Sequence, residues 1–257
     1  MLNRLNKIFD GVLHRSQLRR IQRWAQDVPA MDFARLRQTR KKARELQRGL
    51  ERTLQRAEGR LALPLIGSDL VDAPLHSDWT YRPELWRLPV SPPGLAGVAN
   101  ETRFGAEAVV FHNCDVSELT LRQIRNHLDE DLAPFGVNLD VFRFDGSFLS
   151  LVVELPQEAV AGLKRRHLVR FAAQIDYEHP LEVFVRLNVR HGPNTEQLVR
   201  ELPLGETDVA VDFDLAYSNL NERRIERAWV DIIFEGPDMN QIYLRDVTLS
   251  RRPRAEI

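Results

Sequence analysis

Hydrophobic and polar residues alternate most regularly between Leu181 and Arg190. The odd positions of this run are aliphatic, and the even positions carry Glu182, Phe184, Arg186, Asn188 and Arg190. A β-strand directs successive side chains to opposite faces, so a period of two predicts a strand with one buried face and one largely polar face.

The runs 167–177 and 208–215 show the same alternation, and loops are predicted at 178–180 and 191–194. Further strands are predicted at 108–114, 139–145, 148–156, 197–203, 226–235 and 241–251, whereas 117–132 fits a strand or a helix. Asp145-Gly146 predicts a tight hairpin between 139–144 and 148–155. Many short strands at close spacing predict a mainly β fold, a jelly-roll-like antiparallel β-sandwich.

The N-terminal part changes to a helical period, which predicts an α-helical extension of the sandwich. Leu2, Leu5, Phe9 and Val12 form an apolar stripe, a second helix begins near Ser16, and the longest helix runs from Asp32, its N-cap, to about Arg60. We therefore expect a basic amphipathic helical extension at 1–61, a proline-rich wrapping arm at 62–107 and the β-sandwich domain at 108–257.

The arm at 62–107 holds six of the fourteen prolines, which interrupt helices and sheet ladders. It also holds Trp79, Tyr81 and Trp86. These aromatic residues are expected to anchor the arm to the core, and the other interpretation is a platform for a ligand.

Charge divides the chain into two parts of opposite sign. Residues 1–60 hold 16 Lys or Arg against 6 Asp or Glu, and the remaining residues hold 20 against 31. The basic helices are predicted either to present a solvated face packed on the acidic body or to engage a protein partner or an anionic membrane surface; nucleic acid is the weaker prediction. Residues 1–13 have the pattern of a surface-lying membrane anchor.

Known sequence motifs for chemistry are missing from the chain. There is no P-loop, no Gly-x-Gly-x-x-Gly, no Cys-x-x-Cys and no Gly-x-Ser-x-Gly, and the seven histidines are scattered. We therefore expect neither a cofactor nor a metal, and not an enzyme.

The single cysteine, Cys114, suits a reducing compartment and is expected to be a partly buried packing residue. Residues 1–13 lack the apolar core of a secretory signal, so the cytoplasm is the predicted location.

The candidate ligand site lies on the polar faces of the central strands. An aromatic ring can contact the apolar face of a sugar, and Arg, Asn and Asp can bind its hydroxyls. The predicted ligand-binding residues are Phe184, Arg186, Asn188, Arg190, His191, Asn194, Asp212 and Trp229, with Arg170, Gln174, Asp214 and Asp231 on the same polar face. The other interpretation of this face is a set of cross-strand ion pairs covered by the arm or a helix.

Strand direction predicts which loops share an end of the sandwich. His191–Gln197 is expected beside Ser218–Arg224 at one end, and Asp145-Gly146, Glu178-His179 and Glu235–Asn240 at the other. Glu235, Asp238 and Asn240 either donate oxygens to a calcium ion or serve ordinary turn chemistry.

Two resemblances extend this picture. The stretches 229–236 and 242–249 are similar to the closing strands of carbohydrate-binding-module-type jelly rolls, a resemblance that covers roughly 139–252. The whole chain resembles an alphaproteobacterial protein family of unknown function, through 59–67, 144–150 and 188–197. The first resemblance implies a non-enzymatic, glycan-binding or polysaccharide-associated module. The alternative is a cytoplasmic scaffold protein that uses its basic helices to engage a partner.

Overall fold

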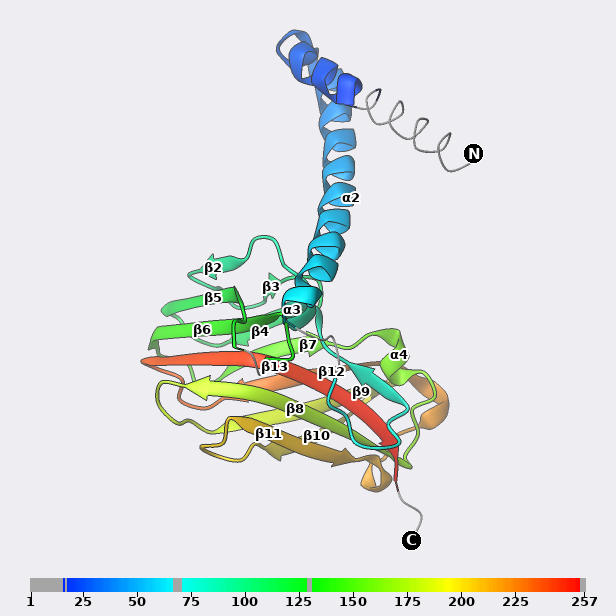
Figure 1. The fold of residues 1–257 in the computed structure, drawn as a ribbon, viewed down its shortest axis with the longest axis vertical. Helices are drawn as coiled ribbons and strands as arrows, with labels where there is room; N and C mark the ends of the chain where they lie inside the picture. Colours follow the sequence, from blue (N-terminus) through cyan, green and yellow to red (C-terminus); the bar gives the residue numbers. More distant parts are fainter. Residues whose placement is uncertain (1–15, 17, 67–70, 129–130, 255–257) are drawn as a thin grey trace. The chain divides into compact units, whose positions relative to one another are not determined.

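A computed structural model describes residues 16, 18–66, 71–128 and 131–254 of the chain (Figure 1). The chain divides into two compact units, Met1–Leu54 and Gln55–Ile257. Each unit is described by itself. In the described residues, no helix is both long and apolar enough to cross a membrane.

The first unit is helical. Residues 18–27 form a helix that ends in the 3-10 turn η1 (Val28–Ala30), and the long helix α2 (Phe33–Ile66) follows. Asp32 caps α2, because its Oδ1 accepts a hydrogen bond from the backbone N–H of Arg35 at 2.8 Å. The predicted cap is confirmed, and α2 continues beyond the predicted end at Arg60. The predicted stripe at residues 2–13 lies outside the described residues.

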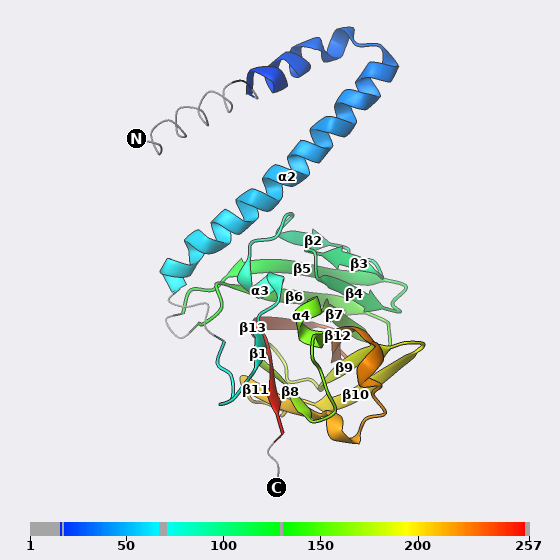
Figure 2. The same ribbon diagram turned by 90° about the vertical axis from the view of Figure 1, so that its right-hand side faces the viewer.

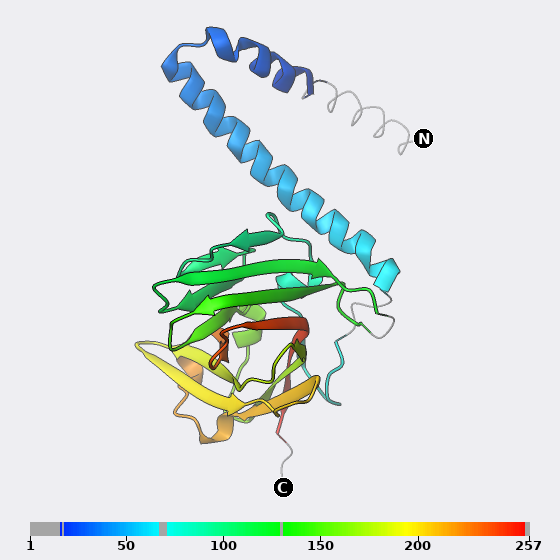
Figure 3. The same cartoon turned by 90° about the vertical axis from the view of Figure 1, so that its left-hand side faces the viewer.

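The second unit contains two antiparallel sheets that form a sandwich (Figures 2 and 3). Sheet A has the strand order β11 (Asp208–Asp214), β8 (His167–Tyr177), β13 (Asn240–Pro253), β6 (Phe135–Phe144), β5 (Ser117–Arg125) and β2 (Gly94–Ala96), and β1 (Trp79–Tyr81) also pairs with β13. Sheet B has the order β10 (Asn194–Glu201), β9 (Val183–His191), β12 (Ile225–Phe234), β7 (Leu149–Glu154), β4 (Ala108–His112) and β3 (Thr102–Phe104).

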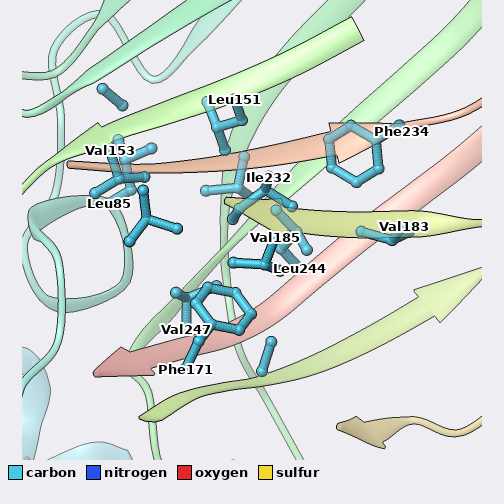
Figure 4. Close-up of a cluster of buried hydrophobic side chains, with 14 of the residues drawn as sticks. Leu85, Leu151, Val153, Phe171, Val183, Val185, Ile232, Phe234, Leu244 and Val247 are labelled. Carbon is cyan, nitrogen blue, oxygen red and sulfur yellow. The ribbon is translucent and has the colours of Figure 1, made fainter. Parts of the chain in front are cut away.

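The alternating pattern produces this sandwich because each strand turns its apolar face inward. Figure 4 shows Leu151, Val185 and Ile232 of sheet B meeting Phe171, Leu244 and Val247 of sheet A. Burial of each such side chain contributes about 1.5–3 kcal/mol. The predicted mainly β sandwich with an N-terminal helix is confirmed, and β5 shows that 117–125 is a strand.

The predicted hairpin at Asp145-Gly146 is wrong. The strand before it, β6, belongs to sheet A, and the strand after it, β7, belongs to sheet B. The Asp145 carboxylate accepts hydrogen bonds from the backbone N–H groups of Asp115 and Val116, at 3.0 and 3.3 Å, so it organises a crossing between the sheets. Alternation alone does not reveal which sheet a strand joins, because both inner faces are apolar.

The proline-rich segment is anchored by its aromatic residues. Trp86, in the short helix α3 (Glu84–Arg87), is completely buried, and its indole N–H donates to the carbonyl of Leu244 at 2.8 Å. The Tyr81 hydroxyl donates to Glu107. The anchoring prediction is confirmed for these two residues, and the segment also adds β1, β2 and β3 to the sheets. Three other short helices connect strands: α4 (Gln157–Val160), η2 (Leu215–Tyr217) and η3 (Glu222–Arg224).

Candidate functional site

Most of the predicted ligand-binding residues lie on the outer face of sheet B. The strand registers place them in two neighbouring rows across β10, β9 and β12: Gln197, Asn188 and Trp229 in one, and Val199, Arg186 and Asp231 in the other. Phe184 and Arg190 flank these rows on β9. The structure therefore brings Phe184, Arg186, Asn188, Arg190 and Trp229 together on one face of sheet B, where Asn188 is completely buried.

The centre of this surface is a hydrogen-bonded network. Asp231 is only 2% exposed, and its Oδ2 accepts from Arg186 Nε at 2.6 Å and from Asn188 Nδ2 at 3.1 Å. Gln197 Nε2 donates to Asn188 Oδ1 at 3.0 Å. The cross-strand ion pair foreseen from the sequence is thus present, and it occupies the polar groups that the sequence analysis assigned to a ligand.

Trp229 is half-buried in this surface. The guanidinium carbon of Arg227 lies 4.9 Å from the centroid of the Trp229 ring, a distance typical of a cation–π contact. One face of the ring is therefore engaged by the protein itself. Partly exposed Phe184, Ile233 and Val199 lie nearby in the registers, so this face is more apolar than the sequence pattern indicated.

Asp212 does not belong to this surface. It lies on β11, which pairs with β8 and not with β9, and the register places it opposite Arg170 on the outer face of sheet A. Arg170, Gln174 and Asp214 also lie on β8 and β11 of sheet A. The predicted polar face is therefore divided between the two outer faces of the sandwich, because the sequence does not reveal strand neighbours.

His191 and Asn194 lie at the turn between β9 and β10. His191 is buried, and its Nδ1 accepts from the backbone N–H of Asn221 at 3.3 Å. The backbone N–H of Gly192 donates to the carbonyl of Arg224 at 3.0 Å. These contacts confirm that residues 191–197 and 218–224 lie at the same end of the sandwich. They also show that the His191 ring contacts the backbone of the neighbouring loop.

The outer face of sheet A contains a hollow that the sequence analysis missed. Ala210, Ala172 and Thr248 form one row across β11, β8 and β13. The adjoining rows carry longer side chains at most positions: Asp208, Gln174 and Asp246 on one side, and Asp212 and Arg170 beside the short Ser250 on the other. Small side chains between two rows of longer ones leave a trough of about 410 Å³.

Residues that do not belong to sheet A close one side of the trough. Strand β6 pairs with Asn240–Leu244 and β1 pairs with Leu249–Arg251, which leaves the middle of β13 without a partner on that side. Leu132 and the segment Asp72–Pro74 line the trough there. The floor is thus made of small residues, the wall carries the acidic Asp72 beside Ala73, Pro74 and Leu132, and both ends are polar.

The polar groups of the trough are placed by contacts with neighbouring side chains. Asp246 accepts two hydrogen bonds from Arg82, with Nε to Oδ1 at 2.9 Å and Nη2 to Oδ2 at 2.8 Å. Gln174 Nε2 donates to Asp208 Oδ1 at 2.8 Å, and Gln174 Oε1 has no partner within the described residues. The trough thus offers acceptor groups at the Asp208 end and a guanidinium at the Arg170 end.

The polar outer face of sheet A continues beyond the trough to Asp140. Its carboxylate accepts hydrogen bonds from Gln241, Thr120, Asn138 and Arg122 at 2.6 to 2.9 Å. Burial acts to raise the pKa of Asp140, but these hydrogen bonds outweigh burial and lower it below its ordinary value. Nearby, burial and the carboxylates of Asp131 and Asp176 raise the pKa of Tyr243 to about 12.

The other candidate sites have structural partners. Asp238 Oδ1 accepts from the backbone N–H of Phe144 at 2.6 Å, and Asn240 exchanges hydrogen bonds with the backbone of His179. The predicted neighbourhood of these loops is confirmed, and the residues serve turn chemistry.

No cluster of three or more His, Cys, Asp or Glu suited to a metal occurs in the part of the chain that the structure describes. Burial, followed by the hydrogen bond to Asp145, raises the pKa of the Cys114 thiol.

Comparison with known proteins gives a family and distant structural similarities. The family model described as "Family of unknown function (DUF6478)" matches residues 1–257. No protein of curated function matches the sequence. Among solved structures, the chain is similar to the enzymatically active domain of tailspike protein 4 from Bacteriophage CBA120, with a TM-score of 0.40 and 7% identity over 56% of this chain and 19% of that chain.

Two carbohydrate-binding modules are similar at the same level. The family 11 module from Clostridium thermocellum, in complex with a β-1,3-1,4-mixed-linked tetrasaccharide, has a TM-score of 0.39 and 10% identity over 65% of this chain and 100% of that chain. The xylan-binding CBM22-1 domain from Paenibacillus barcinonensis has a TM-score of 0.35 and 6% identity over 63% of this chain and 94% of that chain.

Proposed function

The chain belongs to the family of unknown function DUF6478, and we propose that it is a glycan-binding protein whose ligand occupies the trough on the outer face of sheet A. The observation that carries the proposal is the trough itself. It is a hollow of about 410 Å³ with an alanine floor and hydrogen-bonding groups at both ends. Ligand sites are typically hollows of this order of size, apolar over most of their lining, with a few placed polar groups.

The floor suits the ring of a sugar. Ala172 and Ala210 leave room above the sheet, and Pro74 and Leu132 provide an apolar wall. Sugar rings carry both C–H groups and hydroxyls, so they need apolar contact and hydrogen bonds in the same site. Four residues of β8 separate Gln174 from Arg170, which places the polar ends about 13 Å apart.

The two ends supply complementary hydrogen-bonding groups. The Asp208 carboxylate accepts from hydroxyls, and the Arg170 guanidinium donates. Arg170 has no hydrogen-bond or ion-pair partner in the described part of the chain, so its donors remain available. Hydrogen bonds to charged groups contribute about 1.5–3 kcal/mol each, which is enough to fix the orientation of a ligand.

The outer face of sheet B remains the site predicted from the sequence. We favour the trough over it because Arg227 already covers one face of Trp229, and because Arg186 and Asp231 are paired with each other. The two faces make different predictions for substitution, so an experiment can separate them.

We propose binding without catalysis. Hydrolysis of a glycosidic bond requires two carboxyl groups that act on one substrate. Three acidic residues line the trough: Asp72, Asp208 and Asp246. Asp246 is held by Arg82 and only 7% exposed, so it is poorly placed to exchange a proton with a ligand, and Asp208 already accepts a hydrogen bond from Gln174. Incubation of the protein with each bound glycan should release no product.

The test is a glycan panel probed with the wild type and with matched variants. Ala172→Phe and Ala210→Phe place a ring in the trough, and both side chains already point outward, so the fold should survive. The control is Val199→Phe, on the outer face of sheet B and 47% exposed. We expect the two trough variants to lose more than tenfold in affinity, or about 1.4 kcal/mol, and the control to match the wild type. Failure of the wild type to bind any glycan of a broad panel would contradict the proposal.

A further inference from the structure

The helical unit, residues 18–54, exposes several large apolar side chains. Seven large apolar side chains of its described residues are exposed: Leu18, Ile21, Val28, Phe33, Leu46, Leu50 and Leu54. Phe33 is 81% exposed, and Leu50 and Leu54 are each 58% exposed. Single exposed apolar residues are ordinary, but a continuous set indicates an interaction surface.

Four of these side chains line one side of the unit: Ile21, Leu46, Leu50 and Leu54. Residues three and four apart share a helix face, so Ala43, Leu46, Leu50 and Leu54 form one stripe along α2. Ile21 and Trp24 of the preceding helix meet this stripe, and together with Gln47 these residues line an apolar groove of about 350 Å³. We call this set the leucine stripe.

A stripe of positive charge lies on a different face of α2, well around the helix from the leucine stripe. Arg37, Arg40, Lys41, Arg44 and Arg48 line one hollow of the helix surface, and all five are exposed. We call this set the basic stripe. Residues 18–54 hold eleven Lys or Arg against four Asp or Glu, so the unit as a whole is strongly positive.

We propose that this unit binds the surface of an anionic lipid bilayer, with the leucine stripe in the acyl boundary and the basic stripe against the headgroups. Helices of this kind lie in the membrane interface, because apolar burial and attraction to anionic lipids act together. The binding partner must offer an apolar environment to the leucine stripe and negative charge to the basic stripe. Nucleic acid complements the basic stripe but offers the leucines no apolar environment.

The test is flotation of the full chain with vesicles of phosphatidylserine and phosphatidylcholine, compared with vesicles of phosphatidylcholine alone. One variant carries Leu46→Gln, Leu50→Gln and Leu54→Gln, and a second carries Gln at all five positions of the basic stripe. Glutamine is a good helix former, so α2 should persist, which circular dichroism verifies. The control carries Val116→Gln, Val199→Gln and Leu204→Gln, three exposed apolar residues of the other unit.

We expect the wild type and the control to float with the anionic vesicles and to remain unbound with phosphatidylcholine alone. Each cation removed should weaken partitioning about fivefold, and the leucine variant should not float. Three results would overturn the proposal: a wild type that does not float, a leucine variant that floats like the control, or leucine-dependent self-association with no vesicle binding. Binding to RNA or DNA that needs the basic stripe but not the leucines, without flotation, would assign the surface to nucleic acid instead.

Discussion

Arg82 and Asp246 form a buried, two-pronged ion pair that joins the residue after β1 to the rim of the trough. The two hydrogen bonds measure 2.8 and 2.9 Å, and the side chains are 1% and 9% exposed. Asp246 follows an irregularity in the register of β13 between Leu244 and Asp246. The pair therefore holds the segment that carries β1 against the one part of β13 that lacks a strand partner on that side.

Removing one member of this pair should destabilise the protein strongly. Arg82→Met leaves a buried carboxylate without its partner, and the expected loss is about 3–5 kcal/mol in the free energy of unfolding. The double variant Arg82→Met with Asp246→Leu should recover part of that loss, because no charge remains buried. Urea unfolding of the three proteins provides the measurement. A single variant within 1 kcal/mol of the wild type would show that the pair does not anchor the segment.

Trp86 should be the most sensitive position of the proline-rich segment. It is fully buried and its indole donates to Leu244, so Trp86→Ala creates a cavity and leaves a carbonyl unpaired. The expected cost is about 3–5 kcal/mol. Leu204→Ala serves as a control because Leu204 is exposed, and it should change stability by less than about 0.5 kcal/mol. A thermal scan that gave equal melting temperatures for the two variants would contradict the anchoring role.

Acid should weaken the cluster around Asp140. Because hydrogen bonds lower the pKa of Asp140 in the folded state, its contribution to stability is complete above the unfolded value of about 3.9 and is lost as the pH falls through the folded pKa. Asp140→Asn should therefore be less stable than the wild type near neutral pH, and the difference should shrink below about pH 3.9. Denaturant unfolding of the two proteins across this pH range measures the difference in stability. A gap that stayed constant with pH would mean that the Asp140 charge contributes nothing.

The sequence was sufficient to predict most strands after residue 108, but not β1, β2, β3 or β5, and not which strands are neighbours. Alternation along β9 and β8 revealed which residues point inward, because apolar residues every second position require one buried face. It did not reveal that Asp212 lies beside Arg170 and away from Arg186, since the same pattern fits either sheet. Strand direction alone predicted which loops lie at the same end of the sandwich, as the contact between His191 and Asn221 shows.

The trough was not predictable for the same reason. Ala172, Ala210 and Thr248 come from three strands that are distant in sequence, and they form a row only through the registers of β11, β8 and β13. Each of these residues is unremarkable in its own strand. A hollow made by small residues in adjacent strands depends on tertiary register, which single-chain periodicity does not contain.

The most direct test of the glycan proposal is to map where the ligand binds. A glycan that the wild type retains in the panel is titrated into the isotopically labelled protein, and backbone amide shifts are followed by NMR. The trough account predicts that the largest changes occur at Ala172, Gln174, Ala210 and Thr248, and that Trp229→Ala binds as the wild type does. Changes centred on Asn188 and Trp229, together with loss of binding in Trp229→Ala, would contradict the trough and place the ligand on the outer face of sheet B.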